Sequence, residues 1–263
     1  MELRSIHPLV SVVTPSFNQA RFLERTIESV FWQDYPSIEY IIVDGGSTDG
    51  SEAIIRRHSS RLAWWVSEPD AGQTDAINKG LARARGDILA WLNSDDTWLA
   101  GAVSSAVHAF AEQVDSGLVY GNVNYIDGED RIIGRFPAAQ TNYRLLRQGY
   151  VHIPQQAAFF RADLWRSVGP LDSSLFFAMD YDLWLRIARQ AQVKFIPQVW
   201  ANFRLHSAAK TIAADERCWP EMLRIHYRDG GSFLSIMVAK YYLRKLLAPL
   251  LRWRRRRLMV RGA

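Results

Sequence analysis

Apolar and polar positions alternate in blocks along the first half of the chain. Short runs rich in Val, Ile and Trp, each bounded by turn residues, predict strands at residues 9–14, 38–43, 62–66, 88–92 and 118–120. Apolar residues with helical spacing predict helices at 22–31, from about Ser51, at 73–84 and at 99–113. Strand and helix in strict alternation are typical of a parallel sheet covered by helices. The chain is therefore predicted to be an α/β protein with a Rossmann-like, mostly parallel central sheet flanked by helices.

The pattern becomes less regular after residue 121. Residues 120–127 and 131–136 predict a hairpin with Gly128 in its turn. The remaining sequence predicts a short helix, a strand, a helix opened by acidic residues and two final strands, at residues 143–148, 153–160, 176–188, 193–196 and 200–205.

Polar residues follow the predicted strands of the first half, at the point where each strand ends. They lie at residues 15–18, Asp44, Glu68 with Asp70, and Asn93 with Asp95 and Asp96. Because crossovers between parallel strands are right-handed, these strand ends share one edge of the sheet, and open α/β sheets bind ligands at that edge. One such turn is ordinary helix capping, since Asp, Asn and Ser are common N-caps. Four in succession favour a binding site.

Composition narrows the class of protein. Hydrophobic residues make up 48% of the chain, with 10 Trp, 10 Tyr and 12 Phe, which excludes a disordered protein. A single cysteine, Cys218, excludes an internal disulfide framework and a cysteine-based zinc site. The first residues lack the apolar core of a signal peptide, and no run approaches the roughly 20 apolar residues of a membrane-spanning helix. A cytoplasmic location is expected.

Positive charge is concentrated at the C-terminal end. Residues 240–263 contain nine basic and no acidic residues, which leaves 23 basic and 27 acidic residues, a net charge of −4, for the rest of the chain. The body is therefore not expected to bind nucleic acid. Apolar residues between 233 and 251 share one helical face and precede Arg-Trp-Arg-Arg-Arg-Arg at 252–257. This amphipathic basic helix is typical of segments that bind an anionic membrane surface; the alternative is a helix docked on the body with a solvated basic end.

Five short motifs occur in a specific order. They are Ser-Val-Val-Thr-Pro-Ser-Phe-Asn at 11–18, Ile-Val-Asp-Gly-Gly-Ser-Thr-Asp-Gly at 42–50, Asn-Lys-Gly at 78–80, Asn-Ser-Asp-Asp at 93–96 and Met-Asp-Tyr-Asp-Leu-Trp-Leu-Arg at 179–186. In these motifs the chain, over about residues 10–211, resembles a family 2 glycosyltransferase of the inverting type with the GT-A fold. The resemblance implies transfer of a sugar from a nucleoside-diphosphate sugar, with UDP the first choice, to a hydroxyl of a glycan or lipid-linked glycan.

The resemblance also implies a divalent cation, Mn²⁺ or Mg²⁺. A nucleoside diphosphate is a modest leaving group until its developing charge is neutralised, and a hard cation with oxygen ligands does this. Asp95 matches the metal-binding acid of the family, and Asp96 is expected behind it or against the donor sugar. His206 matches a late histidine that completes metal or pyrophosphate binding; the alternative is a structural histidine. Arg204 and Lys210 flank it and are expected to contact the diphosphate.

The nucleotide is expected at the ends of the first two strands. Asp44 resembles the acid that accepts a hydrogen bond from the nucleobase. Further contacts to the base, ribose or nearby sugar are assigned to Thr14, Pro15, Phe17, Asn18, Asp70, Asn93 and Ser94. Asn18 also suits the N-cap of the next helix, and Asp70 has the same alternative. The family commonly has Asp where this chain has Asn93, so a lower metal affinity is expected.

Inversion requires one base opposite the leaving group. Asp180, near the start of the helix at 176–188, matches that base, and the helix dipole favours its ionised form. Family members commonly carry Glu before the base, where this chain has Met179. Asp182 and Arg186 are spaced for a simple helix ion pair. Because sugars pack on aromatic rings and bond to amides, the predicted acceptor residues are Gln155, Gln156 and Trp184.

The predicted GT-A domain covers residues 1–215, with a nucleotide-sugar half to about 120 and an acceptor and catalytic half from 121, followed by the helical basic tail at 216–263. The tail predicts peripheral attachment to the inner face of the cell membrane. Three alternatives are open. A nucleotidyltransferase would carry a glycine- and arginine-rich loop after the first strand, which residues 14–18 lack. A non-catalytic nucleotide-sugar-binding or assembly protein would tolerate Asp180→Asn, and a phosphatase would release phosphate without acceptor.

Overall fold

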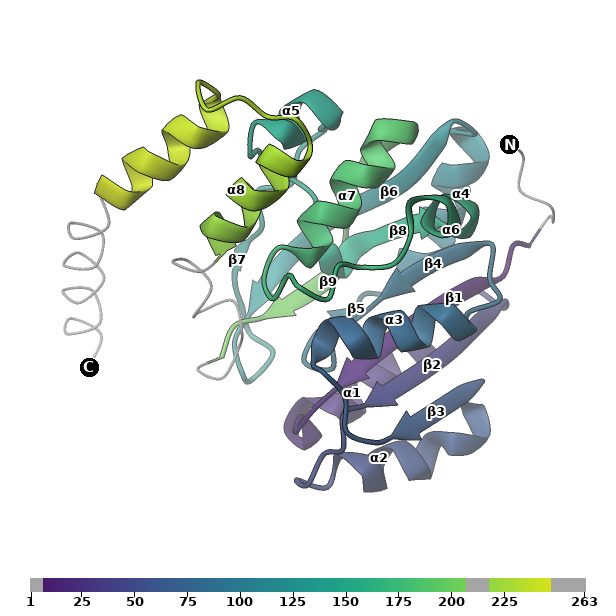
Figure 1. Cartoon of the computed structure of the whole chain (residues 1–263). Coiled ribbons are helices and arrows are strands. Elements are labelled where there is room, and N and C mark those ends of the chain that lie inside the picture. The colour runs from purple at the N-terminus through teal and green to yellow at the C-terminus, as the bar shows by residue number, and fades with distance from the viewer. Residues whose placement is uncertain (1–6, 207–217, 247–263) are drawn as a thin grey trace.

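The computed structural model describes residues 7–206 and 218–246. Within them, nine strands form one sheet: β1 (Val10–Ser16), β2 (Ile38–Asp44), β3 (Trp64–Ser67), β4 (Ile88–Trp91), β5 (Thr97–Trp98), β6 (Ser116–Ile126), β7 (Ile132–Arg135), β8 (Ala158–Arg161) and β9 (Gln192–Arg204). The strand order is β3-β2-β1-β4-β8-β6-β9-β5, with β7 beside β6 (Figure 1). The helices are α1 (Ala20–Phe31), α2 (Ser51–His58), α3 (Gln73–Arg83), α4 (Ala102–Glu112), α5 (Tyr143–Arg147), α6 (Ala162–Val168), α7 (Met179–Gln190) and α8 (Cys218–Arg228).

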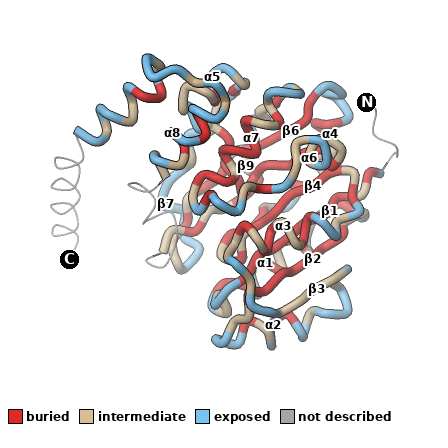
Figure 2. Tube along the Cα trace, viewed as in Figure 1, coloured by how far each residue is buried: buried red, intermediate tan, exposed pale blue. Residues whose placement is uncertain are grey.

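The first four strands are parallel, as predicted. β1 pairs with β2 and β4, and β2 pairs with β3, so that Ser16, Asp44 and Ser67 are aligned at the carboxyl end of their strands. Successive side chains of a strand point to opposite faces of the sheet, and both faces are covered here. Val12 packs with the core under α1, α2 and α4, whereas Val13 packs with the core under α3 and α7. Figure 2 shows the buried residues running through the central strands.

Beyond β4 the sheet becomes mixed. β8 is antiparallel to β4 and β6, whereas β9 is parallel to β6. Because β8 is antiparallel to both of these strands, β4 and β6 run in the same direction. α7 leads into β9, so α7 begins at the edge where β4, β6 and β9 end. The predicted hairpin is confirmed by the pairing of β6 with β7.

Three predicted strands have different boundaries in the structure. The strands expected at 193–196 and 200–205 are one strand, β9. Phe195 pairs with Tyr120 and Val199 with Asn122, so a bulge in β9 accommodates Pro197, which has no N–H to donate. The strand expected at 153–160 begins only at Ala158, because a 3₁₀ turn, η2 (Gln155–Ala157), precedes it.

Two helical segments follow the sheet. α8 packs on α7 through Met222 and Ile225, and residues 236–246 form a second helix that buries Met237. Lys240 Nζ of this helix donates to Gln148 O (3.1 Å). For residues 236–246, these contacts support the alternative of a helix docked on the body. The basic run at 252–257 lies outside the described residues. Across residues 7–206 and 218–246, every helix is too short or too polar to cross a membrane.

Candidate active site

The loops after β1 and β2 are joined by hydrogen bonds. The Asn18 side-chain oxygen accepts from the Thr48 N–H (2.9 Å), and Asn18 has a φ of +52°, in the left-handed region that Asn tolerates. The prediction that Asn18 caps α1 is therefore wrong. Asp49 caps the start of α1 instead, because one of its oxygens accepts from the Ala20 N–H (2.8 Å). Its other oxygen accepts from the Ser51 N–H of α2 (3.0 Å).

Two carboxylates lie at the end of β2. Asp44 is buried and accepts from the Ser47 N–H (2.9 Å), the Ser47 hydroxyl (2.6 Å) and the Ser67 hydroxyl (2.7 Å). Asp70 lies over Gly45, where a Cβ would come within 2.8 Å of an Asp70 oxygen. A side chain at position 45 would therefore displace Asp70. The structure brings Asp44 and Asp70 to the same edge, as predicted from the strand order.

The predicted nucleotide residues of β1 face different environments. The Thr14 hydroxyl is in the core, 3.0 Å from the Tyr40 hydroxyl, and Pro15 is buried. Phe17, in the loop that follows, is 60% exposed. Ser16 was not predicted as a site residue, although its place at the end of β1 is a usable signal. Its hydroxyl is buried and has no hydrogen-bond partner among the described residues, so it is a candidate ligand contact.

Asn93 is the centre of a hydrogen-bond network just after β4. Its amide nitrogen donates to Gln155 Oε1 (3.1 Å) and Asp96 Oδ2 (3.2 Å), and its oxygen accepts from Gln73 Nε2 (2.8 Å). Gln155 is buried and donates to Trp91 O (2.6 Å). An acid at position 93 would face the Asp96 carboxylate, which explains why an amide suits this chain. The buried Gln155 holds Asn93 in place, which differs from the predicted contact with an acceptor.

Asp96 is fully buried between the ends of β4 and β9. It accepts from the Arg204 N–H (2.9 Å) and from Asn93. Burial, followed by the charge of Asp95, raises the pKa of Asp96 well above its usual value, although the hydrogen bonds from Arg204, Asn93 and Gln156 act in the opposite direction. Like Gln155, Gln156 is buried and holds this network in place. The buried neighbour Ser94 completes the turn.

Asp95 and His206 are in contact, as their predicted shared role requires. Asp95 Oδ2 lies 3.0 Å from His206 Nε2, both side chains are partly exposed, and the histidine ring packs on Phe22. Two ligands at about 2.1 Å on adjacent corners of an octahedral cation lie roughly 3 Å apart, so the pair fits Mn²⁺ or Mg²⁺. In the described part of the chain, no three His, Cys, Asp or Glu residues gather around one point. Phosphate oxygens and water would have to complete the sphere, as is usual for Mg²⁺.

The Arg204 guanidinium is buried and bound to protein oxygens. Its Nε donates to Asp95 O (2.8 Å), Nη1 donates to Asp127 O (2.9 Å), and Nη2 lies 2.6 Å from Asp130 Oδ1. These contacts hold the Asp95 backbone and leave the guanidinium away from solvent, so the geometry favours a positioning role over the predicted diphosphate contact. Lys210 lies outside the described residues.

Asp180 lies in the first turn of α7, where its Oδ1 accepts from the Tyr181 N–H (2.7 Å). The preceding residue, Met179, contacts the hydroxyl of Thr74 at the start of α3 (2.7 Å). Gln73, beside Thr74, donates to Asn93 as described above. The starts of α3 and α7 are therefore joined to the end of β4, on the edge of the sheet that carries Asp95 and Asp44.

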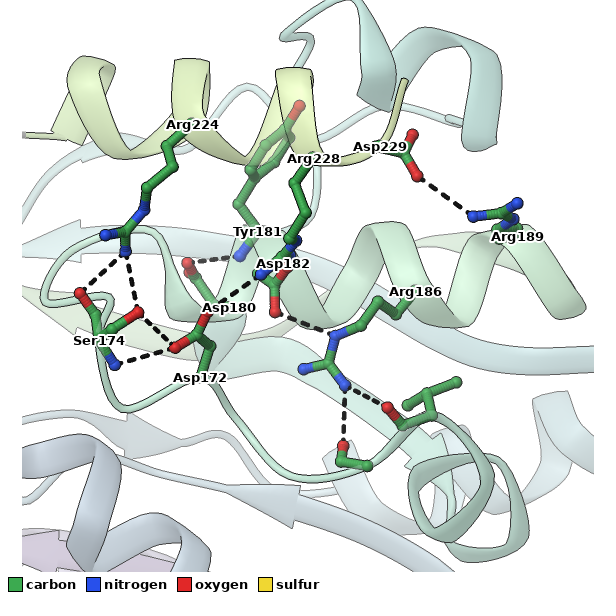
Figure 3. A network of polar contacts seen from close by, with 12 residues as sticks. Asp172, Ser174, Asp180, Tyr181, Asp182, Arg186, Arg189, Arg224, Arg228 and Asp229 are labelled. Atoms are coloured by element: carbon green, nitrogen blue, oxygen red, sulfur yellow. Dashed lines mark hydrogen bonds and ion pairs between the residues drawn. The ribbon is translucent and has the colours of Figure 1, made fainter. Parts of the chain in front are cut away.

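Two predictions about α7 have different outcomes. The Asp182–Arg186 ion pair is confirmed at 3.0 Å, and Arg228 of α8 binds the same carboxylate (Figure 3). Trp184 is 0% exposed and stacks on Trp91 with ring centroids 5.3 Å apart. Its ring has no face open to an acceptor, so the predicted acceptor contact of Trp184 does not fit this position.

Sequence comparisons identify relatives along most of the chain. Residues 11–168 match the family described as Glycosyl transferase family 2. The chain is 37% identical over 236 residues to an uncharacterised glycosyltransferase of Mycobacterium tuberculosis, a match that covers 87% of this chain and 88% of that protein. An uncharacterised glycosyltransferase of Rickettsia typhi is 26% identical over 221 residues, which are 81% of this chain and 69% of that protein.

The fold is similar to that of solved glycosyltransferases. TarS of S. aureus, residues 1–349 in complex with UDP-GlcNAc, has a TM-score of 0.68 and 16% identity, over 83% of this chain and 65% of that one. The mannosyltransferase PcManGT of Pyrobaculum calidifontis, in complex with GDP-Man and Mn²⁺, has a TM-score of 0.66 and 23% identity, over 91% of this chain and 70% of that one. By its sequence match and its fold, the chain belongs to glycosyltransferase family 2 and is a transferase of the GT-A type.

Proposed function

We propose that this glycosyltransferase moves a sugar from a nucleoside-diphosphate sugar to a hydroxyl of a glycan or lipid-linked glycan, with inversion at the anomeric carbon. One observation carries the proposal: Asp95 and His206, two typical cation ligands, are in contact at the edge of the sheet where the helix bearing Asp180 begins. The structural neighbours support a nucleotide-sugar donor, because TarS was solved with UDP-GlcNAc and PcManGT with GDP-Man. UDP is the first choice of nucleotide.

The nucleoside is proposed to lie over the ends of β1 and β2. Asp44 already accepts three hydrogen bonds within its turn. Asp70, which lies over Gly45 and is only partly buried, is therefore the more available acceptor for a nucleobase N–H. The Ser16 hydroxyl, buried without a partner among the described residues, is suited to the ribose. A site distinguishes between ligands when its buried polar groups form hydrogen bonds only with the correct ligand.

Asp95 and His206 would hold Mn²⁺ or Mg²⁺ against the diphosphate. Bound there, the cation would supply Lewis-acid chemistry that neutralises charge on the leaving group. Arg204 keeps the Asp95 backbone in place through its 2.8 Å hydrogen bond. PcManGT, which contains Mn²⁺ in its solved complex, supports this choice of cation.

Asp180 is proposed to take the proton from the acceptor hydroxyl. In an inverting transfer, the acceptor oxygen forms its bond to the anomeric carbon from one face while the bond to the diphosphate breaks on the other. The proton passes to the Asp180 carboxylate. Its place in the first turn of α7 favours the ionised form, because the helix dipole is positive at that end.

The proposed acceptor includes lipid-linked glycans met at the inner face of the cell membrane. The helix at 236–246 exposes Ile236, Leu243 and Leu246, and Phe233 and Leu234 just before it are also exposed. In the sequence, this apolar surface is followed by the basic run at 252–257. An anionic membrane surface suits an apolar face beside dense positive charge.

Release of nucleoside diphosphate from UDP-, GDP- and dTDP-sugars in the presence of Mn²⁺ tests the enzyme without a known acceptor. We expect one donor to be cleaved, cleavage to stop with a chelator, and Asp180→Asn to lower kcat by about 10²- to 10⁴-fold. Asp163→Asn is the matched control, since Asp163 also lies in a first helical turn and accepts from the next N–H (2.8 Å). Full activity of Asp180→Asn would contradict the proposed base, and full activity with chelator would contradict the cation.

A further inference from the structure

Three successive backbone N–H groups donate to one carboxylate just before α7. Glu221 of α8 accepts from Phe176 (3.0 Å), Phe177 (2.8 Å) and Ala178 (2.9 Å). Ala178 is the N-cap of α7 and lies two residues before Asp180. The Ala178 N–H belongs to the start of α7, where N–H groups have no intrahelical partner and the helix dipole attracts an anion. Glu221 therefore supplies that anion from another helix.

Two arginines on the same face of α8 bind residues on either side of Asp180. Arg224 lies three residues after Glu221, and Arg228 lies four residues after Arg224, which places all three side chains on one helical face. Arg224 donates to Ser174 O (2.9 Å), and Arg228 binds the Asp182 carboxylate in the first turn of α7. Figure 3 shows both arginines reaching from α8 to residues on either side of Asp180. α8 thus binds the chain both before and after Asp180.

We propose that Glu221 is a positioning residue for Asp180, an inference that rests on the proposed function of Asp180 as the base. Glu221 fixes the segment at 176–178 and so fixes the direction in which α7 presents the Asp180 carboxylate. Without Glu221, the freed N–H groups need another acceptor. The nearest acid in the first turn is Asp180 itself, already bound to the Tyr181 N–H (2.7 Å). A carboxylate drawn into capping the helix would be withdrawn from the acceptor hydroxyl.

Kinetics of the full-length protein test this role. The readout is nucleoside diphosphate release from whichever UDP-, GDP- or dTDP-sugar of the panel is cleaved fastest, with Mn²⁺. Because a misplaced catalytic group can cost about 10²-fold, we expect Glu221→Ala to lower kcat by about 10- to 100-fold with the donor KM unchanged. Glu221→Gln keeps an acceptor oxygen and should recover part of kcat. Glu52→Gln, which removes an exposed acid from the first turn of α2, is the control and should have wild-type kcat.

A double variant separates positioning from a purely structural role. If Glu221 acts through Asp180, Glu221→Ala should lower kcat no further in an Asp180→Asn background, because coupled residues are not additive. The inference would be overturned if the double variant lost kcat by the product of the two single losses. A donor KM that rises in step with the loss of kcat would overturn it as well. Should Glu221→Ala fail to fold, Glu221→Gln takes its place in both measurements. Wild-type kcat in the Glu221 variants, with Asp180→Asn inactive, overturns this inference alone; an active Asp180→Asn overturns the proposed base as well.

Discussion

Asp95 and Asp96 are adjacent in the chain but lie in opposite environments. Asp96 is fully buried, and burial together with the charge of Asp95 raises its pKa well above the usual value. Asp95 keeps a partly exposed edge in contact with His206. A fully buried carboxyl group bonded to Arg204 and Asn93 has no open side for a ligand. The two acids therefore have different positions: Asp96 joins the ends of two strands, and Asp95 is the one open to the proposed cation.

The first prediction concerns the Asp95–His206 pair. Nucleotide with Mn²⁺ should raise the melting temperature of the wild type, by an amount equivalent to about 2.7 kcal/mol at a 100-fold excess over Kd. Asp95→Ala and His206→Ala should each lose most of this shift, and the double variant should lose no more, because both residues hold one ion. Thermal unfolding with and without Mn²⁺ measures it. Asp34→Ala, at an exposed acid bonded to Ser104, is the control; additive losses would contradict a shared ion.

The second prediction concerns Trp184, which the structure assigns to the core. Trp184→Ala should destabilise the protein by about 3–5 kcal/mol, since it removes a fully buried aromatic side chain stacked on Trp91. Trp32→Ala, at a tryptophan that is 73% exposed, should change stability by less than about 0.5 kcal/mol. Urea unfolding of both variants measures the difference. Equally small losses of stability in the two variants would contradict the buried position of Trp184.

At the scale of elements, the first four strands and their helices were predictable because each strand is buried on both faces. Such strands are continuous apolar runs, as in Ile88–Trp91, and each ends at a polar turn. β5 was missed because two residues carry no periodicity. β9 was predicted as two strands because Pro197 interrupts the run, and only the pairing with β6 carries the strand through its bulge. Long-range pairing of this kind leaves no local signal.

The site was predictable to the same degree. The edge that gathers Asp44, Asp70 and Asp95 follows from parallel strand order, and the contact of Asp95 with His206 was expected from the family resemblance. The partners of individual side chains were not. Arg204 looks like a free cation beside His206, but tertiary contacts bury it. Glu221 has no motif of its own, since its role arises only where α8 docks against the start of α7.

The third prediction concerns the opposite edge of the sheet, where Glu39 of β2 joins the turn before β4. Glu39 is buried and accepts from the Arg85 N–H (2.7 Å), Arg85 Nε (2.6 Å) and the Ser11 hydroxyl (2.5 Å). Burial raises the pKa of Glu39, but these hydrogen bonds and the Arg85 charge outweigh it, so the folded-state pKa is below the ordinary value. The ionised form therefore stabilises the fold fully above the unfolded pKa, about 4.3, and that contribution is lost as pH falls through the lower folded value.

Glu39→Gln should accordingly cost about 1–3 kcal/mol at neutral pH. The difference from wild type should narrow as the pH falls below about 4. Urea unfolding at both pH values measures it. Glu129→Gln, at an exposed acid paired with Arg21, should differ from wild type by at most about 1 kcal/mol at either pH. If the stability difference between Glu39→Gln and the wild type stays constant or widens in acid, the charge of Glu39 is not what stabilises the turn.

At the scale of the whole molecule, one sheet runs through both predicted halves of the domain. β6 crosses the expected division near residue 120, and β8 pairs with β4 of the first half and β6 of the second. The network of Asn93, Asp96 and Arg204 spans the same junction. The two predicted halves are therefore built on one continuous sheet, with α7 and α8 added over the second half.

The fourth prediction concerns attachment of the molecule to a membrane. The helix at 236–246 docks on the body through Met237 and Lys240, so removal of residues 247–263 should leave the fold and donor cleavage unchanged. That deletion removes six of the nine basic residues that follow position 239. Since each basic residue near an anionic surface contributes about 1 kcal/mol, the shortened protein should no longer sediment with phosphatidylserine-containing vesicles.

Two comparisons separate charge from apolar contact. Binding of the full chain should weaken as salt rises, because salt screens exposed charges, and it should be lost on pure phosphatidylcholine vesicles. Leu243→Glu together with Leu246→Glu alters the exposed apolar face without touching the basic run, and should weaken binding as well. Vesicle binding that survives both the deletion and high salt would mean that the positive C-terminal segment does not attach this glycosyltransferase to the membrane, and lipid-linked acceptors would then have to reach the site from solution.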